Sequence, residues 1–486
     1  MEAPKLLTRK EDIEEFLRSR GPSFLSQEFG EKRKITIQNI EFLGPFVSGY
    51  RSFGVPCRLT VKIGKGPVLE EKTLEIWFKN YFSTVDSTGV NRRERCILEG
   101  ERLYAVSRVS ESPVPRVLYF QPPNLDSDSS LPIVQITYYL GGCILGKILR
   151  ELEPDEKEVL KRFVNIQPVT KDELLNNLGN NREKNSLILD YLISLGFIST
   201  GNNKGDSGTN NHKLTLTRGL PETRFIYHGQ YKYENDDFYK PGMIRDKLIH
   251  HGLEAIIKLQ ENAKKAKFNK EAMPKDPNID NLKEEFISKL ENIALKNNTL
   301  KFLRNEILDS YIEEVIAPIY ESREDITIIQ GDCHPGNMLV GNEDYKNPKI
   351  YLVDLYRCSK GPWFSDVVDY LTHLKLFCGL DDITSNSLRK NSLELKNLKD
   401  SLSIQKKYKL VDLDRSIFAA GSISGILRHH SNTYNQVEKF DLERRFNMYN
   451  SHIQKVSNIL YHENLISKDL WKSLNLLTNY KEIDKE

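Results

Sequence analysis

The stretch QGDCHPGNML, residues 330–339, carries an aspartate and an asparagine five positions apart and follows the apolar run ITII. The downstream stretch KIYLVD ends at another aspartate, Asp354, after the turn-rich segment GNEDYKN. This order predicts a strand, a loop that begins near Asp332, and a second strand that ends at Asp354. A hairpin of this kind brings Asn337 and Asp354 close together and leaves Asp332 at its mouth.

These three side chains suit a divalent cation and a proton acceptor. A carboxylate and an amide oxygen are hard ligands of the kind that Mg²⁺ takes, and Mg²⁺ usually keeps waters and substrate phosphates as its other ligands. The remaining carboxylate, that of Asp332, can accept a hydroxyl proton. The alternative is an ordinary β-hairpin in which Asp and Asn form turns. Residue types, spacing and strand context together favour the catalytic interpretation.

The offset between Asp332 and Asn337 matches the catalytic loop of protein kinases. The motifs GDCHPGN, YLVD and GPWFSD together resemble the aminoglycoside phosphotransferase and choline kinase-like superfamily. That resemblance implies an α+β, bilobal protein-kinase-like fold. It also implies that Asp332 is the catalytic base and that Asn337 and Asp354 hold Mg²⁺. Asp366 would lie at the start of the next helix and steady the catalytic loop.

Two positions depart from the pattern of that superfamily. Gln330 stands where the family has a histidine that braces the loop, and a glutamine can still donate a hydrogen bond there. Tyr356, followed by Arg357, stands where the family often has a second acid, which disfavours a cationic acceptor and favours a neutral or acidic one. His334 is expected to support the loop structurally, because neither metal binding nor proton transfer requires it.

The same resemblance assigns nucleotide-binding residues upstream. Lys79 in LEIWFKNYF would contact the phosphates, and its partner on the following helix is either Glu99 or Glu101. Glu99 has the family's spacing to later apolar residues and is preferred, whereas Glu101 fits the distance to PVP better. Further expected contacts are Ser48 and Gly49 in the phosphate loop GPFVSGYRS, and Tyr139 and Leu140 in the hinge beside adenine.

Patterning along the chain predicts four regions. Residues 1–30 form a helical lead-in, and residues 31–150 form the N-lobe of strands with one helix. Residues 155–220 contain three short helices and a hairpin around GNNKGDSGTNN, which resembles a winged-helix domain inserted between the lobes. Residues 221–486 form a mainly helical C-lobe that carries the catalytic loop.

The winged-helix-like insertion raises the question of DNA binding. Arg182 and Lys184 on its third helix are interrupted by Glu183, and the hairpin loop has one lysine against one aspartate. Helices that read the major groove carry more positive charge. The insertion is therefore expected to bind a protein partner or to pack, and DNA is not expected.

Bulk composition excludes several classes of protein. Seventy basic and 68 acidic residues give a net charge of +2, which offers no global attraction to nucleic acid or lipid. The six cysteines form no CxxC pair, which argues against a zinc site or disulfide framework and suits a reducing compartment. No signal-like or membrane-spanning stretch is visible, so a cytoplasmic protein is expected.

These observations predict an ATP-dependent phosphotransferase that uses Mg²⁺ and acts on a hydroxyl of an unidentified small molecule. One alternative is a catalytically weak kinase-like regulator or scaffold that binds a partner or DNA through the insertion. Another is a protein Ser/Thr kinase, which ranks lower because no activation loop with an A-P-E ending is recognisable.

Overall fold

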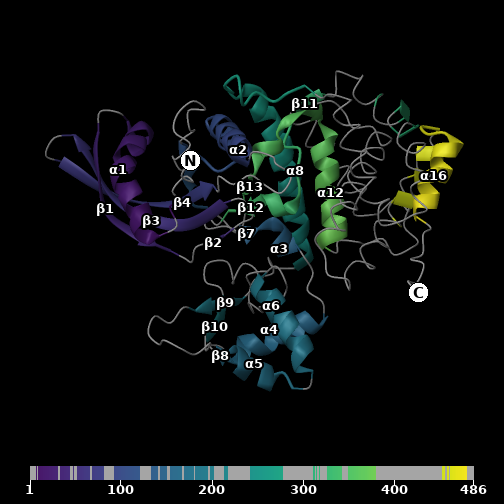
Figure 1. The fold of residues 1–486 in the computed structure, drawn as a ribbon, viewed down its shortest axis with the longest axis horizontal. Coiled ribbons are helices and arrows are strands. Elements are labelled where there is room, and N and C mark those ends of the chain that lie inside the picture. Colours follow the sequence, from purple (N-terminus) through teal and green to yellow (C-terminus); the bar gives the residue numbers. More distant parts are fainter. Residues whose placement is uncertain are drawn as a thin grey trace, which may run out of the picture.

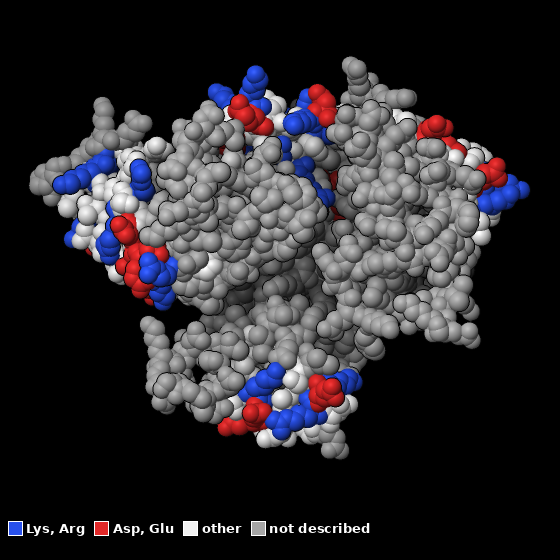
Figure 2. Space-filling view, in the orientation of Figure 1, with Lys and Arg blue, Asp and Glu red and all other residues white. Residues whose placement is uncertain are grey.

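The structure is a computed structural model of the chain. It describes residues 7, 9–30, 33–43, 47–48, 52–65, 68–81, 92–120, 133–140, 143–149, 154–166, 169–179, 181–194, 198–201, 213–216, 241–276, 326–341, 349–378 and 464–478, with scattered positions in 310–317 and 451–462. No helix among these residues is long and apolar enough to cross a membrane. On the face shown in Figure 2 their basic and acidic side chains are interspersed, in keeping with the small net charge.

A six-stranded antiparallel sheet forms the N-terminal part of the fold. Its strands run in the order β1-β3-β4-β6-β5, and β2 pairs with β3 beside this path. The members are β1 (Lys34–Phe42), β2 (Val47–Ser48), β3 (Ser52–Lys65), β4 (Val68–Tyr81), β5 (Val117–Phe120) and β6 (Ile133–Tyr138). Side chains alternate between the two faces of a strand, so one face of this sheet can pack in a hydrophobic core while the other carries the side chains of the candidate site.

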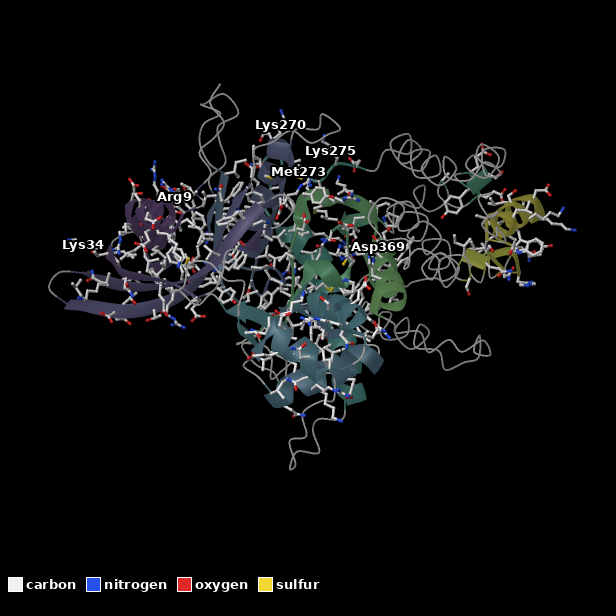
Figure 3. The ribbon with its side chains drawn as sticks, turned by 60° about the horizontal axis from the view of Figure 1, so that its bottom comes forward. Arg9, Lys34, Lys270, Met273, Lys275 and Asp369 are labelled. Carbon is white, nitrogen blue, oxygen red and sulfur yellow. The ribbon has the colours of Figure 1, made fainter. Side chains whose placement is uncertain are left out.

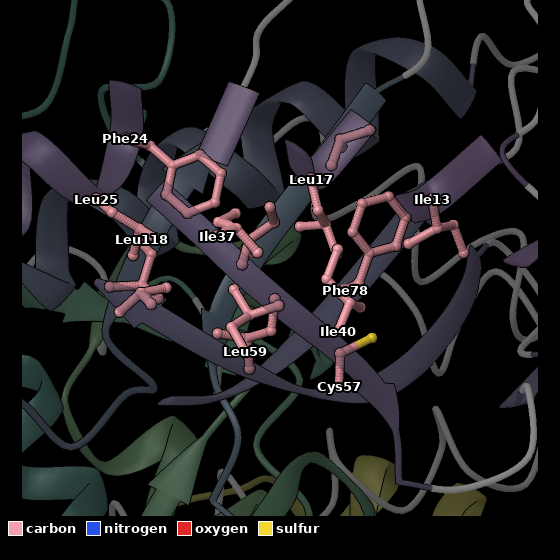
Figure 4. Close-up of a cluster of buried hydrophobic side chains, with 14 of the residues drawn as sticks. Ile13, Leu17, Phe24, Leu25, Ile37, Ile40, Cys57, Leu59, Phe78 and Leu118 are labelled. Carbon is pink, nitrogen blue, oxygen red and sulfur yellow. The ribbon is translucent and has the colours of Figure 1, made fainter. Parts of the chain in front are cut away.

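Helix α1 (Lys10–Phe29) covers one face of this sheet. Its apolar residues Ile13, Leu17 and Phe24 recur at helical spacing and pack against strand residues such as Phe78, as Figure 4 shows. Helix α1 lies within the helical lead-in predicted over residues 1–30 and continues through Gly21 and Pro22. The buried stripe continues past the proline, so its packing offsets the loss of one backbone donor.

The end of α1 is also tied to the sheet by charge. Glu28 forms ion pairs with Arg116 at 2.9 Å and with Arg108 at 3.6 Å. The hydroxyl of Tyr138, the last residue of β6, donates to the same carboxylate at 3.5 Å. Helix α1 is therefore fastened to the strand that leads into the predicted hinge.

Helix α2 (Arg92–Ser107) lies between the N-terminal sheet and the later strands. It approaches β5 very closely, because a Cβ on Gly100 would lie 2.0 Å from the Phe120 ring. The next elements, β7 (Cys143–Ile144) and α3 (Leu145–Leu149), leave the first sheet. Strand β7 pairs with residues 339–340, which lie much later in the chain. It therefore joins the N-terminal part of the fold to the C-terminal part.

A small unit with a core of its own follows α3. Its core contains Leu160, Phe163, Leu174, Leu189 and Leu192, all buried. The elements are α4 (Pro154–Ile166), β8 (Val169–Thr170), α5 (Lys171–Asn177), α6 (Arg182–Ser194), β9 (Ile198–Gly201) and β10 (Lys213–Leu216), with the strand order β8-β10-β9. Residues 202–212, the tip of the predicted wing, lie outside the described residues.

The C-terminal part combines helices with two small sheets (Figure 1). The sheets are β13-β12-β7 and β11-β14. The described elements are α8 (Pro241–Lys265), β11 (Ile326–Ile329), η3 (Pro335–Asn337), β12 (Met338–Val340), β13 (Ile350–Leu352), η4 (Leu355–Arg357), β14 (Ser359–Pro362), α12 (Phe364–Cys378) and α16 (Lys468–Thr478).

The α+β class predicted from the sequence is confirmed, and one detail of the hairpin is corrected. The strand that pairs with β13 is the short β12, in the register Met338↔Leu352 to Val340↔Ile350. Strand β11, which precedes the catalytic loop, pairs instead with β14. The loop thus leaves one small sheet and enters the other, which lets both sheets hold its ends.

Candidate active site

Strand β4 and helix α2 bring Lys79 and Glu99 together. Phe78 points into the core under α1, so its neighbour Lys79 points to the opposite face. Glu99 is buried on α2, and its Oε1 lies 2.7 Å from the Lys79 Nζ. Glu101 lies two residues further round the helix, and its buried Oε2 has no hydrogen-bond partner among the described residues. The carboxylate that binds Lys79 is that of Glu99.

Lys79 is held as a cation in this position. Burial alone lowers its pKa, but the carboxylates of Glu99 and then Asp354 outweigh burial, and the pKa of Lys79 lies above its ordinary value. Its Nζ also lies 4.4 Å from the centroid of the Tyr81 ring, a cation–π contact. The Tyr81 hydroxyl in turn donates to Gln135 Oε1. The Asp354 carboxylate thus lies near enough to Lys79 to stabilise its charge, while the ion pair itself is formed with Glu99.

The backbone before Asp332 is held by a buried carboxylate. Asp366, in the first turn of α12, accepts from the N–H of Gln330 at 2.8 Å and from the N–H of Gly331 at 3.0 Å. Gly331 has φ +80°, and a Cβ there would lie 2.6 Å from the Arg357 carbonyl oxygen. A glycine is needed at this position for both reasons. Asp366 thus fixes where the catalytic loop begins.

The Gln330 side chain bridges the two ends of the motif. It is fully buried, and its Nε2 donates at 3.1 Å to the carbonyl oxygens of both Val353 and Asp354. Its Oε1 accepts from the Asp332 N–H at 2.9 Å. One side chain therefore ties the residue predicted to be the base to the residue predicted to bind the metal.

Asn337 and Asp354 are placed side by side by the β12–β13 pairing. The Val353 N–H donates to the Asn337 carbonyl at 2.9 Å, one residue before Asp354. The Asn337 Nδ2 donates to the Asp332 carbonyl at 3.0 Å, which leaves the amide oxygen to act as a ligand. Asp354 adopts a left-handed backbone conformation with φ 61° and ψ 64°. An amide oxygen and a carboxylate fit Mg²⁺, which takes its remaining ligands from phosphates and water.

His334 serves the backbone of the catalytic loop. Its Nδ1 accepts from the Gly336 N–H at 3.0 Å and caps the turn η3. Its ring stacks on that of His373, with the centroids 4.7 Å apart. His373 lies on α12, one turn after Asp369, so α12 supports this loop a second time. Among the described residues no group of three or more His, Cys, Asp or Glu side chains gathers as a metal site.

The predicted base-binding end is only partly described. The Tyr139 N–H donates to the Glu75 carbonyl at 2.9 Å, so this donor of the predicted hinge is already engaged within the sheet. The Tyr139 ring stacks on Trp77, with the centroids 6.1 Å apart. Ser48 lies in β2, which pairs with β3, whereas Gly49 lies outside the described residues.

Two residues at this site were not found from the sequence. Tyr81 lies two residues after Lys79, a position that places it on the same face of β4. Arg102 lies on α2 and is 5% exposed. The available signal was its spacing of three from Glu99, which puts both on one side of α2.

Comparisons with known proteins find structural resemblance only. No protein-family model matches the chain, and no curated protein sequence matches it. A choline/ethanolamine kinase family protein from Mesorhizobium loti aligns with 90% of this chain and 94% of its own, at 10% identity and a TM-score of 0.39. An aminoglycoside phosphotransferase bound to GDP and kanamycin covers 90% of this chain and 98% of its own, at 13% identity and a TM-score of 0.37.

A third solved structure is a glucosamine kinase in complex with glucosamine, ADP and inorganic phosphate. It covers 90% of this chain and 96% of its own, at 10% identity and a TM-score of 0.35. Identities and TM-scores this low do not allow the role of any residue to be transferred from these proteins to this chain. The α+β class rests on the chain's own strands and helices, and what its site does follows from its own contacts.

Proposed function

We propose that this protein is an ATP-dependent phosphotransferase that transfers the γ-phosphate to a hydroxyl group of a small molecule. The observation that carries the proposal is the meeting of three elements at Lys79. The lysine of β4 is paired with Glu99 of α2, and its pKa is raised by both Glu99 and Asp354. A cation fixed beside a metal-binding carboxylate is what phosphoryl transfer requires.

In this proposal each residue has a distinct task. Lys79 contacts the nucleotide phosphates, with its charge kept in place by Glu99. Asn337 and Asp354 would hold Mg²⁺, which neutralises negative charge that develops on the phosphates. Asp332 orients the acceptor hydroxyl and takes its proton as the oxygen attacks phosphorus. Gln330, His334 and Asp366 keep the catalytic loop in place, and alignment supplies most of the rate enhancement.

The nucleotide would lie against the face of the sheet that β4 and β6 form with the Lys79 side chain. Ser48 and Gly49 belong to the loop proposed to cover the phosphates, and Tyr139 with Leu140 is proposed to face the base. The bonded Tyr139 N–H directs this contact to the remaining backbone groups of the segment. The stacked Trp77 ring supports Tyr139 in that role.

The acceptor is proposed to be neutral or acidic. Tyr356 and the exposed Arg357 are the second and third residues after Asp354. The Arg357 Nε donates to the Tyr356 hydroxyl. A guanidinium at this place repels a polyamine acceptor and attracts a carboxylate or phosphate.

The decisive experiment measures ATP consumption by the purified protein with a panel of sugars, sugar acids, amino alcohols, aminoglycosides and proteins. Turnover with a small alcohol, Mg²⁺-dependent and reduced about 10²-fold or more in Asp332→Asn while nucleotide binding persists, is the expected result. Phosphorylation of proteins alone would favour a Ser/Thr kinase. Nucleotide binding without transfer to any acceptor would favour the regulator or scaffold.

The unit formed by α4 to β10 is proposed to be a winged-helix-like insertion that binds a protein partner. Two of its arginines are engaged internally: Arg182 pairs with Asp172, and Arg162 pairs with Glu158 at 2.8 Å. Such cations are poorly placed to neutralise DNA phosphates. A mobility shift on genomic fragments at physiological salt should therefore show no specific complex. Nanomolar, sequence-selective binding that is lost on deletion of residues 155–219 would overturn this.

A further inference from the structure

Arg102 connects helix α2 to the turn that follows Asp354. Its Nε donates to the Ala272 carbonyl at 3.0 Å. Its Nη1 donates to the carbonyl oxygens of Leu355, at 3.5 Å, and Tyr356. Leu355 and Tyr356 are the first two residues after Asp354, so the guanidinium holds the backbone on the far side of the proposed metal ligand.

Burial of a guanidinium is costly, which makes this placement informative. Arg102 is 5% exposed, and burial lowers its pKa, partly countered by the Cys358 thiol. The carbonyl oxygens around it replace part of its lost hydration, because a planar guanidinium can donate in several directions at once. An apolar side chain could fill this place without the free-energy cost of removing a charged guanidinium from water. The hydrogen bonds of Arg102 are therefore the feature that an apolar residue could not supply.

Two side chains of α2 thus contact different elements of the same candidate site. Glu99 reaches Lys79 on the sheet, and Arg102, three residues later, reaches η4. The segment after α2 adds a third tie, because the Leu352 N–H donates to the Pro113 carbonyl at 2.7 Å. Strand β13 before Asp354 and turn η4 after it are therefore both held by α2 or by the segment that follows it.

The third partner of Arg102 belongs to the segment after α8. Ala272 is buried, whereas its neighbours Lys270, Met273 and Lys275 lie at the outer edge of the molecule, as Figure 3 shows. The Lys360 N–H donates to the Lys275 carbonyl at 2.9 Å, which joins this segment to β14. Arg102 is consequently anchored to a backbone that is itself fixed.

We propose that Arg102 is a positioning residue that couples the Lys79–Glu99 pair to Asp354. It sets the distance between the phosphate-binding lysine and the proposed metal-binding carboxylate by holding α2 against η4. This inference rests on the proposed phosphotransferase function. Its consequence is that the placement of α2 beside η4 is held by contacts within the described residues of the fold.

The test compares Arg102→Met and Arg102→Lys with Arg108→Met as a matched control. Methionine keeps length without donors, and lysine can satisfy only part of the carbonyl set. Arg108 follows the end of α2 and donates to the Val117 carbonyl at 3.1 Å, away from η4. Two quantities are measured: hydrogen exchange of a peptide covering 353–358, and ADP affinity with and without Mg²⁺.

In Arg102→Met the exchange of 353–358 should quicken at least tenfold. The gain in ADP affinity on adding Mg²⁺ should fall about tenfold, while metal-free affinity stays within twofold. Arg102→Lys should lie between, and Arg108→Met should match the wild type in both readouts. An unchanged exchange rate, an equal loss of affinity with and without Mg²⁺, or loss of the whole fold in both Arg102 variants would overturn the coupling. If the wild type binds no nucleotide, the proposed function fails, and the exchange measurement still judges the coupling.

Discussion

Truncation of Gln330 to alanine should loosen both ends of the catalytic motif. The variant loses two donations from Nε2, to Val353 and Asp354, and one acceptance from the Asp332 N–H. Each such bond contributes about 1 kcal/mol net, so the local cost is about 3 kcal/mol before any cavity is counted. Because about 1.4 kcal/mol is a tenfold change, local opening should become about 10²-fold more frequent.

Hydrogen exchange of the loop measures this opening. The best reporters are amides that Gln330 does not itself bind, namely those of Gly331, Asn337 and Val353, which donate to Asp366, His334 and Asn337. Their exchange should quicken by up to about 10²-fold, and turnover should fall at least tenfold as Asp332 loses its fixed position.

Thr327→Val serves as the control on the adjoining strand. Thr327 is buried in β11, and its Oγ1 has no hydrogen-bond partner among the described residues. Removal of that hydroxyl leaves no partner unsatisfied, so exchange of the loop should not change. Equal exchange rates in Gln330→Ala and Thr327→Val would refute the bridging role of Gln330.

Three further outcomes are expected. Asp354→Ala should weaken Mg²⁺-dependent ATP binding by calorimetry and leave metal-free binding nearly unchanged, whereas an equal loss in both would mean that Asp354 is only structural. Glu99→Gln removes the charge that most raises the pKa of Lys79; since Lys79 works as a cation, the alkaline limb of the pH–rate profile should move to lower pH, and Glu101→Gln, the control, should leave it in place. The Cys358 thiol, whose pKa burial raises to about 12, should resist alkylation at pH 8 in the folded protein and react in denaturant, as peptide mass spectrometry can show, and rapid labelling without denaturant would contradict its burial.

The spacing of residues close along the sequence predicts several features of the candidate site. The strand pattern in KTLEIWFKNYF predicts β4, and the preference for Glu99 as the partner of Lys79 matches the ion pair at 2.7 Å. The offset of five in the catalytic loop reflects one compact turn, in which Asn337 donates back to the Asp332 carbonyl. Such features are readable because they depend on residues close along the chain, although their catalytic roles remain predictions.

Tertiary contacts account for what the sequence did not reveal. Strand β12 has three residues, too few to show a period, and exists because β7 and β13 flank it. Arg102 is buried by partners that lie 170 and more residues away, so nothing near it in the sequence distinguishes it from a solvated arginine.

The anchoring of α1 bears on the order in which the chain can fold during synthesis. This helix is synthesised before the sheet that it covers, and Glu28 must await Arg116 and Tyr138, which follow 88 and 110 residues later. Leu118 of its apolar core is equally late. Until β6 has emerged from the ribosome, the sheet is incomplete and the apolar side of α1 cannot be fully buried against it. During synthesis α1 is therefore exposed to chaperones and to aggregation until the strands of its sheet have emerged.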